Sequence, residues 1–122
     1  MYDIQVRDYG YEVTCTGEFH ILDLANLYNE LQNSGIKDQG ILLNLGKLDG
    51  VCECVQTGLV IFEDNVFEDN ASKLAVVIES KDLVTVTNFA IRASDLKDRL
   101  RFIHKDENVE VICKNWLLPQ KV

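Results

Sequence analysis

The first sixteen residues alternate between apolar and polar side chains. The alternation runs over residues 2–7 and returns over 11–16, with a short segment ending in Gly10 between them. A side-chain period of two is typical of a strand that buries one face on a core. The pattern therefore predicts an antiparallel β-hairpin at the start of the chain.

A helical period follows the hairpin. Apolar residues spaced at i, i+3, i+4 and i+7 predict a helix that begins at Asp23 and ends at Asn33-Ser34-Gly35. Its apolar positions are Leu24, Leu27, Tyr28 and Leu31. Asp23 is the predicted N-terminal cap.

Two continuous apolar runs come next, at residues 41–45 and 74–78. Short runs of this kind are typical of strands that are covered on both faces. Between them, apolar residues at helical spacing over 51–62 predict a second helix that begins near Cys52 and ends in an acidic segment. We expect two buried strands joined by this helix.

The last third of the chain contains one ambiguous segment. Residues 82–94 include Leu-Val-Thr-Val-Thr, which favours a strand, but Phe89, Ala90 and Ala93 fit a helical face. With Asp82 as a candidate cap, we predict a helix over 82–93. A short strand near 100–103 and a last helix follow. Asp106 and Glu107 are expected at the start of that helix, where acids favour the positive end of the dipole.

The predicted order of elements is β-β-α-β-α-β-α-β-α. Strands alternating with helices favour a largely parallel sheet with right-handed crossovers, to which the hairpin adds an antiparallel strand. The predicted fold class is α/β with a mixed sheet. No linker divides the chain, so we expect a single domain over residues 1–122.

Charge narrows the classes of partner. The chain has 20 acidic and 12 basic residues, for a net charge of −8. Nucleic acids and anionic membrane surfaces are bound by basic patches, so we expect neither as a partner. No apolar run approaches the ~20 residues of a membrane span, and the N-terminus lacks the apolar core of a signal peptide. We expect a cytoplasmic protein.

Cysteines offer one candidate metal site. The chain has four cysteines and two histidines. They are Cys15, Cys52, Cys54, Cys113, His20 and His104. A structural zinc site usually combines closely spaced pairs, and only Cys52 and Cys54 are close. A cytosol keeps thiols reduced, so we predict small buried cysteines and no metal.

An acidic doublet is the second candidate metal site. Phe-Glu-Asp-Asn occurs at 62–65 and again at 67–70. A calcium loop of the EF-hand type alternates its ligands around a glycine, whereas the doublet has adjacent acids and no glycine. On a helix, positions five apart are rotated by about 140°. We therefore predict a solvated helix end, with Phe62, Val66 or Phe67 beneath it.

Three short strings carry a family resemblance. They are Gly17-Glu18-Phe19 before a helix, Leu43-Asn44-Leu45-Gly46-Lys47-Leu48, and Arg101-Phe102-Ile103-His104 followed by an acidic helix start and Asn115-Trp116-Leu117. Together with the order of elements, they resemble the STAS domain of bacterial anti-sigma-factor antagonists. The SpoIIAA-like branch, which is also similar to lipid-binding Sec14-type domains, is the nearest. The resemblance covers nearly the whole chain.

The resemblance implies a partner-binding surface at the start of the second helix. Antagonists carry a phosphorylatable serine there, within Asp-Ser-Ser-Gly, where helix N–H groups attract anions. A gapless match from Asn44 places Cys52, Glu53 and Cys54 on Asp-Ser-Ser. A match anchored on Thr57-Gly58-Leu59 needs three inserted residues and places Gln56 and Thr57 on the serines. The candidate partner-binding residues are Cys52, Glu53, Cys54, Gln56, Thr57 and Gly58.

Neither register keeps the phosphorylated serine. Glu53 is either a constant mimic of a phosphoserine or an acid that favours a helix N-terminus. Thr57 is a candidate phosphosite or a helix-surface threonine. The resemblance thus implies a module without the standard phosphoserine switch.

The sequence gives little support to an enzyme. It has no Gly-rich phosphate loop and no nucleophile elbow, and we expect neither catalysis nor a cofactor. The resemblance implies a regulatory protein-interaction module whose partner is a regulatory kinase or an anti-sigma-like protein. The alternative is a SpoIIAA/Sec14-like domain that binds a small apolar ligand or lipid.

Overall fold

The structure, a computed structural model, describes residues 1–49 and 53–118, and it leaves the side chains of 53–56 undescribed. Five strands form one sheet in the order β1-β2-β3-β4-β5. β1 is antiparallel to β2, and each later strand is parallel to the one before it. The predicted mixed sheet is confirmed.

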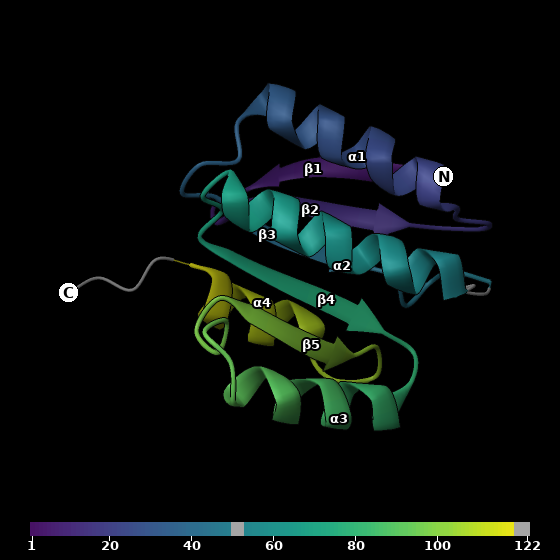
Figure 1. Cartoon of the computed structure of the whole chain (residues 1–122), viewed down its shortest axis with the longest axis vertical. Coiled ribbons are helices and arrows are strands. Elements are labelled where there is room, and N and C mark those ends of the chain that lie inside the picture. The colour runs from purple at the N-terminus through teal and green to yellow at the C-terminus, as the bar shows by residue number, and fades with distance from the viewer. Residues whose placement is uncertain (50–52, 119–122) are drawn as a thin grey trace.

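The order of elements is also as predicted (Figure 1). The elements are β1 Tyr2–Arg7, β2 Gly10–Cys15, α1 Ile21–Ser34, β3 Gly40–Asn44, α2 Glu53–Glu68, β4 Lys73–Ile78, α3 Lys81–Arg92, β5 Leu100–His104 and α4 Val109–Leu117. The ambiguous segment at 82–93 is helical, because α3 spans it to within one residue at each end.

The helix caps differ from the predicted ones. Asp23 lies in the first turn of α1, where its carboxylate accepts a hydrogen bond from the His20 N–H at 2.8 Å. Ser80, rather than Asp82, caps α3 by accepting from the Leu83 N–H. Asn108 caps α4, one residue beyond the predicted acids. In each case the cap is the residue just before the first helical turn. A cap residue has non-helical backbone angles, which let its side chain reach the free N–H groups of that turn.

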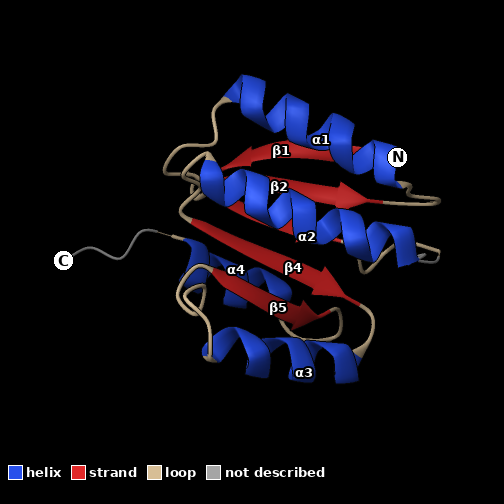
Figure 2. Ribbon diagram, in the orientation of Figure 1, coloured by secondary structure: helices blue, strands red, loops and turns tan. Residues whose placement is uncertain are grey.

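Helices cover the two faces of the sheet unequally (Figure 2). α1, α2 and α3 pack on one face, whose core includes Leu27, Leu31 and Phe62. α4 alone packs on the other face, where Cys113 and Leu117 meet residues of β3, β4 and β5. The two apolar strand runs, β3 and β4, therefore contribute to both cores, as their continuous hydrophobicity predicts.

α1 and α2 lie in close contact, whereas α3 stands apart from α2. Gly58 of α2 is buried, and a Cβ at this position would lie 2.9 Å from Cγ1 of Ile21 and 3.2 Å from Cδ1 of Leu24. The missing side chain thus lets α1 approach α2. α3 packs instead along β5, which leaves a groove between α2 and α3.

Candidate functional site

The groove between α2 and α3 is an apolar candidate site. It has a volume of about 400 Å³ and is open to solvent along one side. Its floor is formed by Leu100 and Phe102 of β5 and by Ile91 of α3. Ligand sites in proteins are usually concavities of about 300–1,000 Å³ with mainly apolar walls.

Helical spacing brings the walls of the groove together. Leu59, Val60 and Glu63 follow one another on the face of α2 that looks toward α3. On α3, Leu83, Thr87 and Ala90 recur at i, i+4 and i+7, the spacing of a single helical face. Residues far apart in the sequence thereby line one depression.

Among the residues that the structure describes, Glu63 is the only titratable one that lines this groove. Burial, together with the neighbouring charge of Asp64, raises the pKa of its carboxyl to about 7. A carboxyl with this pKa is partly protonated at neutral pH, so it can donate as well as accept a hydrogen bond. This half-buried residue corrects the prediction of a solvated helix end at the position of Glu63.

The opposite wall carries a hydroxyl. Thr87 lines the groove from α3, and within residues 1–49 and 53–118 its hydroxyl makes no hydrogen bond. Ser94, at the end of the groove, is different, because its hydroxyl donates to the Ile91 carbonyl and accepts from the Leu96 N–H. In the described lining, Glu63 and Thr87 are therefore the side chains with polar groups available to a ligand.

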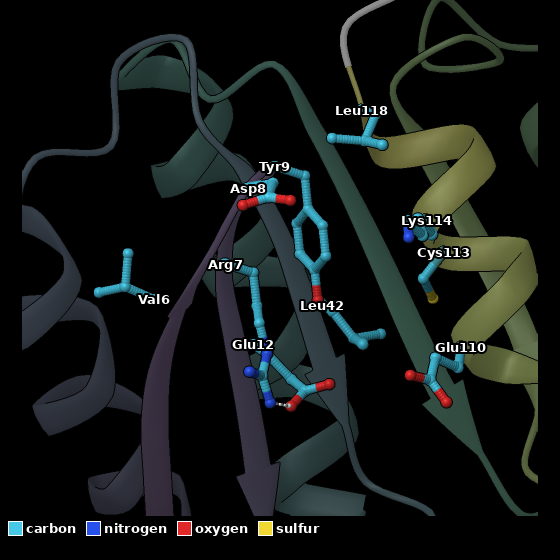
Figure 3. A pocket seen from close by; sticks show the side chains of 10 residues that line it. All are labelled: Val6, Arg7, Asp8, Tyr9, Glu12, Leu42, Glu110, Cys113, Lys114 and Leu118. Atoms are coloured by element: carbon cyan, nitrogen blue, oxygen red, sulfur yellow. Dashed lines mark hydrogen bonds and ion pairs between the residues drawn. The ribbon is translucent and has the colours of Figure 1, made fainter.

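A second depression lies on the other face of the sheet, between the β1–β2 hairpin and α4 (Figure 3). Its volume is about 360 Å³. Arg7 and Glu12 point toward one another and form an ion pair at 3.0 Å. The other titratable residues that line it are Asp8, Tyr9, Glu110, Cys113 and Lys114.

The groups in this second depression are poorly suited to nucleophilic chemistry. Burial raises the pKa of the Cys113 thiol to about 11 and raises the pKa of the Tyr9 hydroxyl as well. Both groups are protonated at neutral pH, and a thiol attacks only as the thiolate. We therefore assign neither the Cys113 thiol nor the Tyr9 hydroxyl a nucleophilic role.

The predicted partner-binding residues are placed only in part. Thr57 is exposed on α2, and Gly58 is buried against α1. Cys52 lies outside the described residues, as do the side chains of Glu53, Cys54 and Gln56. The structure therefore supports a packing role for Gly58, and the partner-binding role of the segment stays a prediction.

The acidic doublet diverges in space. Phe62 and Val66 are buried, as predicted, and Asp64 is exposed. Asp69 accepts a hydrogen bond from the Tyr28 hydroxyl of α1, so this acid ties the two helices together. In the part of the chain that the structure describes, no three potential metal ligands gather.

Two of the four cysteines lie among the described side chains. Cys15 and Cys113 are buried and form no disulfide. Both contribute to the apolar cores. This placement agrees with the prediction of small buried cysteines.

Comparison with known proteins identifies the fold. No protein-family model matches the chain, and no curated protein matches it. A solved structure does match: an uncharacterized protein of the DUF3478 family from Shewanella loihica PV-4, which is described as having a SpoIIAA-like fold. The TM-score is 0.57 at 14% identity, covering 96% of this chain and 92% of that one. The chain thus has a SpoIIAA-like fold, as the resemblance implied.

The helices were also compared with the length of a membrane span. Among the described helices, none is long and apolar enough to cross a bilayer.

Proposed function

We propose that the chain is a non-catalytic binding protein that holds a small, mainly apolar molecule in the groove between α2 and α3. The observation that carries the proposal is the groove itself, about 400 Å³ of open space with apolar walls on both helices and on β5. The similarity of SpoIIAA-like domains to lipid-binding Sec14-type domains supports the same class of ligand.

Two polar groups limit the chemical class of the ligand. Glu63 and Thr87 reach the groove from opposite walls. Because the pKa of Glu63 is about 7, its carboxyl donates a hydrogen bond to an oxygen of the ligand at neutral pH and below. The ligand we propose has an apolar chain and one oxygen-bearing end, as in a medium-chain alcohol or acid.

A titration with 1-decanol and decanoic acid tests this function. We expect each probe to bind saturably by calorimetry. Ala90→Trp fills the groove from α3 and should weaken binding about tenfold or more, because a steric block removes the apolar contacts of the chain. Native mass spectrometry of freshly purified protein would also show any small molecule that the chain already carries.

Ala93→Trp is the matched control. This exposed residue lies three positions further along the chain and outside the lining of the groove. It should leave probe affinity unchanged. The proposal is wrong if neither probe binds saturably, or if both variants lose affinity equally.

A regulatory protein-interaction module is the second candidate function. The observation that favours it is an exposed apolar pair, Ile21 and Leu22, at 45% and 68% of full exposure in the first turn of α1. Ile21 lies directly over Gly58 of α2, beside the predicted partner surface. A kinase or anti-sigma-like protein would bury this pair.

Substitutions at this surface separate the second candidate from the first. With a partner recovered from the native host, Leu22→Asp and Glu53→Lys should each weaken binding, whereas Asp95→Lys, at an exposed position elsewhere, should not. Glu53→Ser should change affinity less than Glu53→Lys, since it removes a charge without reversing it. Unchanged affinity in all these variants would exclude this surface as the partner site.

A further inference from the structure

Basic residues gather in one part of this acidic chain. Five of its twelve Lys and Arg residues lie within residues 92–105, where only Asp95 and Asp98 are acidic. Three of the five, Arg92, Lys97 and Arg101, line a single depression of about 330 Å³. The chain as a whole carries a net charge of −8, so the charge of this cluster is opposite in sign to that of the whole chain.

The depression lies at the outer edge of the sheet, on the flank of α3 that faces away from α2. Arg92 comes from the last turn of α3, Lys97 from the turn that follows, and Arg101 from β5. α4 contributes Trp116. Four consecutive parts of the chain thus place three cations and one aromatic ring around the same space.

The three cations are not neutralised by the protein. Among the described residues, ion pairs within 4 Å use Arg7, Lys105 and the two histidines as the basic partners. Arg92, Lys97 and Arg101 make no ion pair and no side-chain hydrogen bond in residues 1–49 and 53–118. Asp95 and Asp98 do not line the depression.

The neighbouring Arg99, in contrast, has a structural role. The Arg99 guanidinium donates to the Ala71 carbonyl at 2.8 Å and lies 4.5 Å from the centre of the Phe67 ring. Like charges placed together without a partner repel one another. The unpaired cluster beside Arg99 therefore has no evident purpose in holding the fold together.

The rest of the depression is aromatic in part, and its Asn88 and Trp116 make contacts with the protein. The Asn88 amide is held by Phe102, donating to its carbonyl at 2.8 Å and accepting from its N–H at 2.9 Å. Lys73 lies 5.1 Å from the centre of the Trp116 ring and donates to the Trp116 carbonyl. This lysine fixes the ring and adds a further positive charge nearby.

We propose that this depression binds a small phosphorylated molecule, with its phosphate held by Arg92, Lys97 and Arg101 and its remaining part against Trp116. Guanidinium groups bind phosphate oxygens through paired, charge-assisted hydrogen bonds. A phosphate monoester carries up to two negative charges at neutral pH, which three unpaired cations match. The site differs from the apolar groove in its polar lining, although both depressions include Ile91 and Leu100.

Trp116 supplies a reporter, because it is the only tryptophan of the chain. The full chain is titrated with inorganic phosphate and with AMP at constant ionic strength, and binding is followed by tryptophan fluorescence and by calorimetry. We expect saturable binding of AMP. Equal affinities for the two probes would show that the site recognises the phosphate alone. Tighter binding of AMP would show that the rest of the molecule also contacts the site, at Trp116.

Charge-removing variants identify the site. Arg92→Gln and Arg101→Gln should each weaken binding about tenfold or more, the usual effect of losing a charged hydrogen bond. Lys81→Gln removes the same charge at the exposed start of α3, outside the depression, and should leave affinity unchanged. Circular dichroism would verify that every variant stays folded.

Two results would overturn the proposal. One is the absence of saturable binding, by both methods, up to about ten millimolar of either probe. The other is an equal loss of affinity in Lys81→Gln and Arg101→Gln, which would show that binding follows net charge alone.

Discussion

Two glycines determine how the hairpin joins the rest of the sheet. Gly10 has φ +143°, and a Cβ there would lie 2.1 Å from the carbonyl oxygen of Gly40. Gly40 pairs with Gly10 in the parallel ladder between β2 and β3, and its N–H donates to the Tyr9 carbonyl. A side chain on Gly10 would separate the two strands at this point.

We expect Gly10→Ala to lower the free energy of unfolding by about 2–4 kcal/mol, through strain at a positive φ and a clash with backbone. Urea denaturation measures the effect. Gly17→Ala is the control, because Gly17 also has a positive φ but has no atom within 4 Å of an added Cβ. An equal loss in both variants would show that close approach to Gly40 contributes nothing.

The half-buried carboxyl of Glu63 makes stability depend on pH. Its folded-state pKa of about 7 lies above the ordinary value of 4.5 for a glutamate carboxyl, so the unfolded state releases this proton first as the pH rises. Below about pH 4.5 both states are protonated and the residue costs nothing. Stability is then lost as the pH rises from about 4.5 to 7 and stays level above that range.

Glu63→Gln should therefore stabilise the protein by about 1–3 kcal/mol at pH 8 and leave it unchanged at pH 4. Thermal or urea unfolding at several pH values tests this. Glu68→Gln, at an exposed position of the same helix, is the matched control. Its effect on stability should not differ between pH 8 and pH 4. A constant difference between Glu63→Gln and the parent at all pH values would contradict the burial of this carboxyl.

At the scale of elements, α3 gives the edge of the sheet a partner. β5 is the last strand, so its outer N–H and C=O groups lack a neighbouring strand. The Asn88 amide pairs with both backbone groups of Phe102, as a further strand would. This contact ties α3 to the edge strand at Phe102.

Asn88→Leu should lower the free energy of unfolding by about 1–3 kcal/mol, because it leaves two buried backbone groups without partners. It should also promote self-association through the open edge, which light scattering detects. Asn33→Leu, at the exposed end of α1, adds the same apolar group elsewhere and controls for hydrophobicity. Equal stability and scattering in the two variants would show that Asn88 does not protect the edge.

At the scale of the whole molecule, each candidate site has a distinct character. The groove between α2 and α3 is apolar, and the depression beyond α3 is basic. The depression beside α4 contains the ion pair between Arg7 and Glu12. No three potential metal ligands meet in the described part of the chain. The metal question also involves Cys52, which lies outside the described residues.

We expect purified protein to contain no stoichiometric zinc or calcium. The spacing of the two nearby cysteines and of the acidic doublet does not suit either ion. Elemental analysis measures the metal content. One ion per chain, lost on Cys52→Ser or Asp64→Asn, would contradict this prediction.

The amino-acid sequence by itself determined the elements and their order. Side-chain periods of two and of 3.6 residues are local properties, and they located the hairpin and the helices α1, α2 and α4. The segment that forms α3 was ambiguous between strand and helix until a candidate cap favoured a helix. The continuous apolar runs also indicated that β3 and β4 are covered on both faces. Helix caps were placed less well, because several polar residues near each helix start compete for one position.

Only the tertiary structure decided where chemistry can occur. Glu63 looked like one of four equivalent acids, and its raised pKa depends on burial between α2 and α3. Arg92, Lys97 and Arg101 had no motif spacing, and they meet Trp116 only because α3, β5 and α4 converge at one sheet edge. Burial and charge pairing are set by neighbours in space, so a pattern along the chain does not contain them.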